Sequence, residues 1–167
     1  EGPLGRIGLD IYRSDPNIVY ARVEHEKQGG VYRTDDAGST WRKMGSHNGR
    51  PMYFGIIRVD PKNDLRVYLP ETPLGVSDDG GKTFRFDGAE RIHVDHHAMW
   101  IDPNNSSHML IGNDGGVSTT RDKGKTWQWF PHLPVAQFYH VGYDMQTPYN
   151  VCGGLQDNQS WCGPSQV

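Results

Sequence analysis

The sequence lacks the features that would assign it to several common classes of protein. No apolar run approaches the roughly 20 residues that a helix needs to cross a membrane. The net charge is only −3 and the 17 Lys and Arg residues are spread along the chain, so no basic patch is offered to nucleic acid or to an anionic membrane. No nucleophile elbow, phosphate-binding loop or dinucleotide-binding glycine pattern occurs. We therefore expect no nucleic-acid partner and no membrane span.

Helical periodicity is also missing, whereas glycine and aromatic residues are plentiful. No stretch combines the apolar spacing of a helix with helix caps, so helix should be nearly absent. The 167 residues include 21 Gly and 11 Pro, and 11% of them are aromatic. Disordered chains contain few aromatic residues. The composition therefore predicts many short strands joined by tight turns.

A polar motif recurs three times at a constant interval. The pattern Ser/Thr-x-Asp-x-Gly-x-Thr-Trp/Phe occurs in GGVYRTDDAGSTW, LGVSDDGGKTF and GGVSTTRDKGKTW, and its aspartates, Asp36, Asp79 and Asp122, lie 43 residues apart. Asp and Ser/Thr side chains bond nearby backbone amides, and Gly accepts a positive φ, so these residues suit a tight turn. Because every copy carries the same residues, we interpret the three aspartates as structural. The alternative is that they are catalytic or bind a metal.

The interval and the strand pattern together predict an all-β fold. Each unit reads as four short strands, and four strands in roughly 40–50 residues indicate one blade of a β-propeller. The chain should form a single partial propeller over residues 1–167, with about three and a half antiparallel blades where a closed ring has about four to eight. We therefore expect a fragment, or a chain completed by blades from a longer chain or from a second copy. The predicted blades cover approximately residues 4–46, 47–89 and 90–133, followed by a half-blade over 134–167 that stops after its second strand.

The repeated motif resembles the Asp-box, or bacterial neuraminidase repeat, of sialidases, xyloglucanase-type glycosidases and sortilin-type propellers. The segments GPLGRIG, RPMYFGIIRVDP, HVDHHAMWIDP, GNDGGV and GGLQDNQSW resemble large secreted bacterial proteins described as sortilin-like or glycosyl-hydrolase-like. The resemblance implies a propeller in a secreted or periplasmic setting. It does not fix an activity, because the same fold hosts hydrolases and binding proteins. The Arg-Ile-Pro motif of sialidases is not recognisable, because Arg6-Ile7 is followed by Gly8.

Polar residues collect in one of the two sets of loops that the predicted blades have. These loops lead into the first strand of a blade or join its second and third strands, so their side chains should converge at the mouth of the propeller channel. Convergent polar groups in a concavity are the usual sign of a binding site. The candidate ligand-binding residues are Arg50, Tyr53, His93, His96, His97, Gln137, Tyr139, His140, Gln156 and Asn158.

Three carboxylates in these loops are candidate catalytic residues, namely Asp95, Asp114 and Asp157. A glycosidase needs two carboxylates, about 5–5.5 Å apart for retention of configuration and about 6.5–9.5 Å apart for inversion. One of the three would act as an acid and another as a base or nucleophile, with His96 or His97 tuning the pair. Asp114 and Asp157 occupy equivalent positions in their blades, which is also compatible with a structural role.

The segment His93-Val94-Asp95-His96-His97 has a second interpretation. In an extended chain His93, Asp95 and His97 share one face, and two imidazoles with a carboxylate could hold a divalent metal. The alternative is that the histidines hydrogen-bond neighbouring loops while Asp95 orients one of them. The spacing matches no closed zinc signature, and we otherwise expect no cofactor.

The only two cysteines, Cys152 and Cys162, flank Asp157 symmetrically. If the strands on either side of Asp157 pair, the two thiols face each other and could form a disulfide. Two unpaired thiols are the alternative, because so few cysteines do not establish an oxidising compartment.

These observations leave two functions open. The first is a binding module that presents a glycan or peptide site on the face carrying HVDHH, GNDGG and GGLQDNQSW. The alternative is a glycoside hydrolase that acts on a polysaccharide with a carboxylate pair in the channel mouth, its cleft completed by further blades. Whether the protein is an enzyme is not decided by the sequence.

Overall fold

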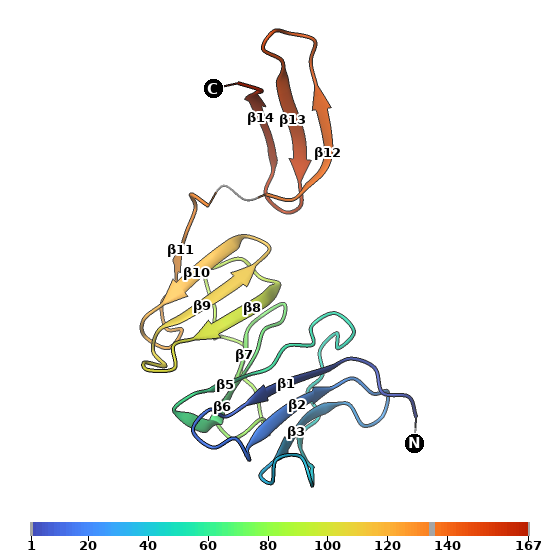
Figure 1. The fold of residues 1–167 in the computed structure, drawn as a ribbon, viewed down its shortest axis with the longest axis vertical. Coiled ribbons are helices and arrows are strands. Elements are labelled where there is room, and N and C mark those ends of the chain that lie inside the picture. The colour runs from blue at the N-terminus through green and yellow to red at the C-terminus, as the bar shows by residue number, and fades with distance from the viewer. Residues whose placement is uncertain (1, 134–135, 167) are drawn as a thin grey trace.

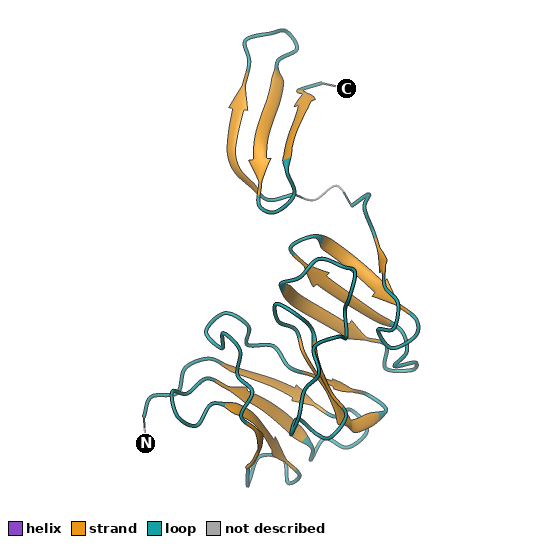
Figure 2. Cartoon of the chain, turned by 180° about the vertical axis from the view of Figure 1, so that it is seen from behind, coloured by secondary structure: helices purple, strands orange, loops and turns teal. Residues whose placement is uncertain are grey.

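The computed structural model describes residues 2–133 and 136–166 and contains strands and loops only (Figures 1 and 2). None of the described segments forms a helix that is long and apolar enough to cross a membrane. The described residues form fourteen strands, which are arranged in four separate antiparallel sheets. The prediction of an all-β, partial β-propeller fold is confirmed.

Each sheet is a meander in which consecutive strands are neighbours. The first sheet contains β1 (Ile7–Ile11), β2 (Val19–Val23), β3 (Gly30–Thr34) and β4 (Arg42–Gly45). The second contains β5 (Arg58–Asp60), β6 (Asn63–Leu69) and β7 (Gly75–Ser77). The third contains β8 (His96–Ile101), β9 (Met109–Asn113), β10 (Gly116–Thr120) and β11 (Gln128–Trp129), and the fourth contains β12 (Phe138–Tyr143), β13 (Asn150–Leu155) and β14 (Ser160–Pro164).

Two sheets depart from the predicted number of strands. The second sheet has three strands, and only an isolated bridge between Val76 and Arg85 stands where a fourth would begin. The last unit was expected to stop after two strands, but β14 adds a third. The sequence of β14, SWCGP, contains a Gly and a Pro, which are unfavourable inside a strand and weaken its strand signal.

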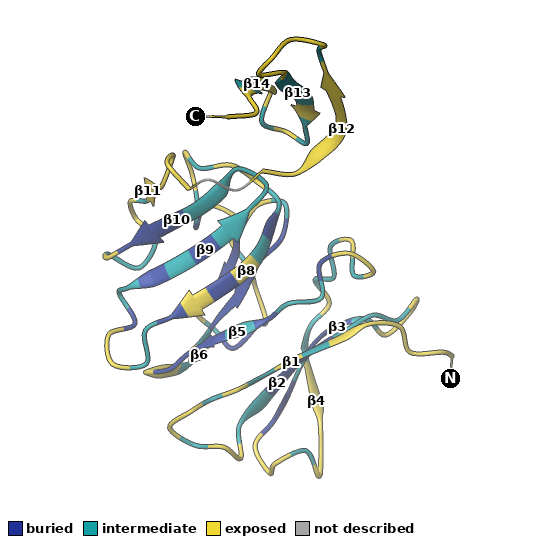
Figure 3. Cartoon of the chain, turned by 45° about the horizontal axis from the view of Figure 1, so that its top comes forward, coloured by how far each residue is buried: buried dark blue, intermediate teal, exposed yellow. Residues whose placement is uncertain are grey.

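The first three sheets are held together by apolar side chains buried between them (Figure 3). Between the first and second sheets lie Tyr20, Val31, Ile57, Val59, Val67 and Leu69. Between the second and third lie Tyr68, Leu74, Val76, Met99, Ile101, Met109 and Ile111. Burying one such side chain contributes about 1.5–3 kcal/mol. These two layers are therefore the main source of stability.

The fourth sheet has no comparable core. Every residue of β12 is exposed, and neither buried cluster includes a residue of β12, β13 or β14. The sheet stands beyond the third one (Figure 1). Its strands are coloured as exposed or intermediate in Figure 3. A disulfide joins Cys152 of β13 to Cys162 of β14, which are directly paired across the two strands.

The repeated motif forms the same turn three times, after the third strand of each of the first three sheets. In the first copy Thr34 Oγ1 accepts a hydrogen bond from Gly38 N (3.0 Å) and donates one to Asp36 Oδ1 (2.6 Å). Asp36 also accepts hydrogen bonds from Thr40 N (2.8 Å) and Thr40 Oγ1 (2.6 Å). Gly38 has a φ of 94°, which favours glycine. Asp79 and Asp122 make equivalent bonds, so all three carboxylates are engaged inside their own turns.

Candidate functional site

The predicted site residues lie on one face of the molecule, which we call the loop face. It carries the β2–β3, β6–β7, β9–β10 and β13–β14 connections and the segments that lead into β1, β5, β8 and β12. Backbone hydrogen bonds tie these parts together across neighbouring sheets, for example from His96 N to the carbonyl of Glu71 (2.9 Å). The opposite face carries the repeated turns.

The segment before β5 presents an aromatic residue beside the third sheet. Arg6 Nη1 donates a hydrogen bond to the carbonyl of Tyr53 (2.8 Å), which ties this segment to the first sheet. Arg50, with a φ of 40°, accepts hydrogen bonds at its carbonyl from the backbone N–H groups of Tyr53 and Phe54. The Arg50 guanidinium lies over the Tyr53 ring, 4.9 Å from its centroid. The exposed Tyr53 side chain is therefore held in a defined position.

His97 links this aromatic segment to a carboxylate. The β8–β9 ladder is irregular between His96 and Ala98, so His97 is left out of the regular pairing. Bulges of this kind redirect a side chain and are common next to active sites. The His97 ring stacks on Phe54 (5.3 Å between centroids) and meets Tyr53 edge-on (5.2 Å). Its Nε2 lies 3.3 Å from Oδ1 of Asp114 in the β9–β10 turn.

Asp114 is the centre of a cluster that joins the third and fourth sheets. Asn158 Nδ2 donates a hydrogen bond to the backbone carbonyl of Asp114 (2.9 Å), which brings the β13–β14 turn with Asp157 next to Asp114. Burial raises the pKa of Asp114 above its usual value, and the neighbouring Asp157 raises it further, while His97 lowers it. Two adjacent carboxyls cannot both ionise easily. Asp114 can therefore hold and deliver a proton above the usual pH range of an aspartate.

Asp95 and His96 lie beside this cluster, and neither joins it directly. Asp95 has a φ of 58° and donates its N–H to the carbonyl of Thr72 (3.1 Å), and its negative charge adds a weaker contribution to the raised pKa of Asp114. The side chain of His96 is buried, and burial lowers its pKa to about 4, against a weaker opposing effect of Asp95. His96 is therefore neutral near pH 7 and is in no position to act as a surface ligand.

The predicted metal ligands His93, Asp95 and His97 do not come together. The prediction assumed an extended chain, but β8 begins only at His96 and Asp95 has left-handed backbone geometry, so the three side chains do not alternate along one strand. His93 Nδ1 contacts the carbonyl of Val94 (3.1 Å), while His97 turns to Asp114. Within residues 2–133 and 136–166, no group of three or more His, Cys, Asp or Glu side chains is arranged to hold a metal ion.

The remaining candidates lie at the edge of the site. Gln156 N donates a hydrogen bond to the carbonyl of Gln137 (3.0 Å), which ties the β13–β14 turn to the segment that leads into β12. Tyr139 and His140 lie on the exposed strand β12, where the ladder is irregular between Phe138 and His140. Tyr139 thus occupies the same place in the fourth sheet as His97 does in the third. The structure gives it no partner ring among the described residues.

One cluster on the loop face was missed at the sequence level. Arg22 is buried, and its Nη2 donates to the carbonyl of Gly49 (2.7 Å) and lies 3.0 Å from Glu71 Oε1. His47 Nε2 lies 2.9 Å from the same carboxylate oxygen. Burial lowers the pKa of Arg22, and Glu71 opposes that effect. The available signal was an arginine inside the apolar run IVYARV, where a buried charge requires a partner.

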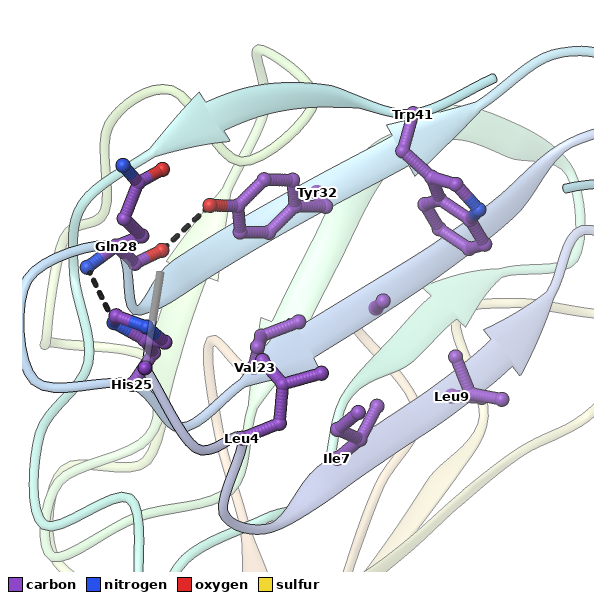
Figure 4. Close-up of a pocket in the computed structure, with 10 residues that line it drawn as sticks. Leu4, Ile7, Leu9, Val23, His25, Gln28, Tyr32 and Trp41 are labelled. Atoms are coloured by element: carbon purple, nitrogen blue, oxygen red, sulfur yellow. Dashed lines mark hydrogen bonds between the residues drawn. The ribbon is translucent and has the colours of Figure 1, made fainter. Parts of the chain in front are cut away.

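A hollow with an apolar lining lies elsewhere, on the open side of the first sheet (Figure 4). It encloses about 700 Å³ and contains none of the predicted site residues. Figure 4 shows Ile7 of β1 beside Val23 of β2, Leu9 farther along β1, and Tyr32 and Trp41 along the far edge. The polar contacts there are local, such as the hydrogen bond from Tyr32 Oη to the carbonyl of Gln28 (2.5 Å). Its lining is Gly2, Leu4, Ile7, Leu9, Ala21, Val23, His25, Gln28, Tyr32 and Trp41.

No family model matches the chain. A curated relative is the oligoxyloglucan-reducing end-specific xyloglucanase of Emericella nidulans, which is 24% identical over 155 residues. The match covers 81% of this chain and 19% of the relative, so the chain spans about a fifth of that protein.

Solved structures with a similar fold include two glycoside hydrolase family 74 (GH74) enzymes. The GH74 enzyme of Niastella koreensis gives a TM-score of 0.63 at 13% identity, covering 95% of this chain and 28% of that one. The GH74 xyloglucanase of Xanthomonas campestris gives a TM-score of 0.57 at 16% identity, covering 94% of this chain and 28% of that one. Because the sequence identity is so low, the structural similarity establishes the β-propeller fold alone.

Proposed function

We propose that this chain is a segment of a secreted, glycan-cleaving β-propeller, in which Asp114 is the general acid and the repeated turns are Asp-boxes. The observation that carries the proposal is the place of Asp114 on the loop face, where its Oδ1 lies 3.3 Å from His97 Nε2 and Asn158 contacts its backbone carbonyl. Burial and the neighbouring Asp157 raise the pKa of this carboxyl. The similarity to a xyloglucanase supports hydrolysis over a role in binding alone. It also supports a neutral polysaccharide as the class of substrate.

We assign different roles to the two carboxyl groups. The acid and base of a glycosidase lie roughly 5–9.5 Å apart, whereas Asp157 is the immediate neighbour of Asp114. Asp157 therefore serves to keep the proton on Asp114, and Asp114 donates it to the departing glycosidic oxygen. We place the second reacting carboxylate on a part of the propeller outside this chain.

The substrate would lie along the aromatic side of the cluster. Tyr53 is exposed and its ring contacts the ring of His97. His97 in turn contacts the carboxyl group of Asp114. Aromatic rings bind the apolar faces of sugar rings, while Arg50 supplies hydrogen-bond donors for hydroxyl groups. Tyr139, Gln156 and Asn158 would extend the surface over the fourth sheet.

Further sheets of the same propeller would cover the open face of the first sheet. Ile7, Leu9, Ala21 and Val23 point to that side, and the corresponding faces of the second and third sheets are buried against their neighbours. Leu9→Lys tests this arrangement. It should change the stability of this chain by less than about 0.5 kcal/mol but cost several times more in the protein at its natural length. Equal effects would contradict it.

Release of reducing ends from xyloglucan by the protein at its natural length tests the function. Removing a general acid should lower kcat by about 10²–10⁴-fold, so Asp114→Asn should lower kcat by that factor and leave glycan binding intact. Asp15→Asn, in a turn at the opposite end of the first sheet, is the matched control and should leave kcat unchanged. Glycan binding without hydrolysis would favour the binding module, and full activity of Asp114→Asn would refute the assignment.

A further inference from the structure

The fourth sheet reaches the rest of the molecule through the turn between β13 and β14. Asn158 in this turn donates a side-chain hydrogen bond to the carbonyl of Asp114 (2.9 Å), and the neighbouring Asp157 raises the pKa of the Asp114 carboxyl. Among the described residues, no other side-chain hydrogen bond or ion pair joins the fourth sheet to the first three. The position of this turn therefore decides whether the carboxyl pair exists.

The fourth sheet has little of its own to keep that turn in place. Phe138, Val141, Tyr143 and Trp161 are exposed, and no side chain of the sheet is fully buried. A small sheet without a buried apolar face is only marginally stable in water, and small domains with weak cores rely on cross-links. Backbone pairing alone would let this hairpin fray.

The disulfide lies where it can prevent such fraying. Cys152 and Cys162 are directly paired across β13 and β14, each five residues from Asp157, and they close the hairpin below its turn. Closing a loop with a covalent bond removes conformations from the open state and so favours the paired one. The covalent bond belongs to the same hairpin as the two residues that reach Asp114.

We propose that the Cys152–Cys162 disulfide is a positioning element for the carboxyl pair, holding Asp157 and Asn158 against Asp114. Reduction by a dithiol breaks the S–S bond, converts both cysteines to thiols with two electrons and two protons from the reductant, and leaves the reductant as a disulfide. The hairpin then opens, Asp157 leaves Asp114, and the pair is lost. The importance of this disulfide for catalysis rests on the proposed role of Asp114. Its effect on the position of Asp157 and Asn158 does not depend on that role.

The test is an NMR titration of the Asp114 carboxyl in this chain, oxidised and after treatment with dithiothreitol. Asp157→Asn with the disulfide intact gives the reference value for the pKa of Asp114 without its neighbour, because the substitution removes the second carboxyl directly. We expect the pKa of Asp114 to fall on reduction to near its value in that variant, and Cys152→Ser/Cys162→Ser to behave like the reduced protein. Val151→Ser, one residue away on the same strand, is the matched control and should keep the oxidised value.

Two readouts keep the outcome unambiguous. Amide signals of β1 to β10 should be unchanged by reduction, which separates opening of the hairpin from global unfolding. An unchanged Asp114 pKa in the reduced protein would overturn the proposal, as would loss of all native signals together with those of the fourth sheet. Glycan hydrolysis is not part of the measurement, so a failure of the proposed activity would leave this result standing.

Discussion

The first three sheets and the fourth sheet follow the same strand order but are stabilised in different ways. Ile57 and Val67 are buried between the first and second sheets, and Met109 between the second and third, whereas Val141 and Tyr143 of the fourth sheet are exposed. A shared meander therefore does not imply a shared source of stability. Three sheets depend on packing against each other. The fourth depends on hydrogen bonds between its own strands, on the Cys152–Cys162 disulfide and on the contact of its β13–β14 turn with Asp114.

Truncating an apolar side chain should have the largest effect, and only in the packed sheets. Ile57→Ala leaves a cavity in a fully buried position and should lower the free energy of unfolding by about 2–5 kcal/mol. Val141→Ala, on the exposed β12, should change it by less than about 0.5 kcal/mol. Urea denaturation of both variants measures the difference. A comparable loss from Val141→Ala would mean that the fourth sheet is packed after all.

The repeated turns should contribute less than the core. Ser77 Oγ is buried and accepts a hydrogen bond from Gly81 N (2.8 Å), so Ser77→Ala leaves that N–H without its partner and should cost about 1–3 kcal/mol. Ser39→Ala removes an exposed hydroxyl from the first copy of the turn and should cost less than about 0.5 kcal/mol. The same denaturation experiment compares them. Equal costs would argue against the buried hydroxyl as the important group of the motif.

The two kinds of carboxylate should respond to pH in opposite directions. Hydrogen bonds from Thr126 and Thr120 lower the pKa of Asp122 to about 2, so this group stabilises the fold above its unfolded pKa and the contribution is lost as the pH falls from about 4 to 2. The raised pKa of Asp114 contributes stability that is present at low pH and lost as the pH rises through that pKa.

Thermal unfolding between pH 2 and pH 6 tests this contrast. In Asp122→Asn, Tm should fall less steeply as the pH is lowered from about 4 to 2, because the titrating group is gone. Asp114→Asn should leave the acid side unchanged and raise Tm slightly near pH 6, because a carboxyl that is costly to ionise has been replaced. A steeper acid limb in Asp122→Asn would reverse the assigned sign.

Much of the fold could be predicted because it repeats. Asp36, Asp79 and Asp122 recur at one interval with one set of partners, so strand order and turn positions follow from local chemistry. The repeat also indicates that Asp114 and Asp157 lie in equivalent turns of neighbouring sheets. Repetition makes these positions comparable in the sequence itself.

The rest depended on local irregularities and on contacts between sheets. The bulge at His97 and the left-handed geometry of Asp95 break the extended pattern that the metal hypothesis assumed. The ion pair of Arg22 with Glu71 joins residues far apart in the sequence, and only packing of the first sheet on the second reveals it. The exposure of the fourth sheet is equally non-local, because Val141 and Tyr143 read as ordinary strand residues.

The pH profile of glycan hydrolysis tests the central claim most directly. If Asp157 keeps the proton on Asp114, the fall of kcat at high pH should move to lower pH in Asp157→Asn, because the ionised form of Asp114 is no longer opposed by a second carboxylate. His97→Gln should move the same limb to higher pH, because it removes the group that lowers the pKa of Asp114. An alkaline limb that stays in place in both variants would contradict Asp114 as the general acid.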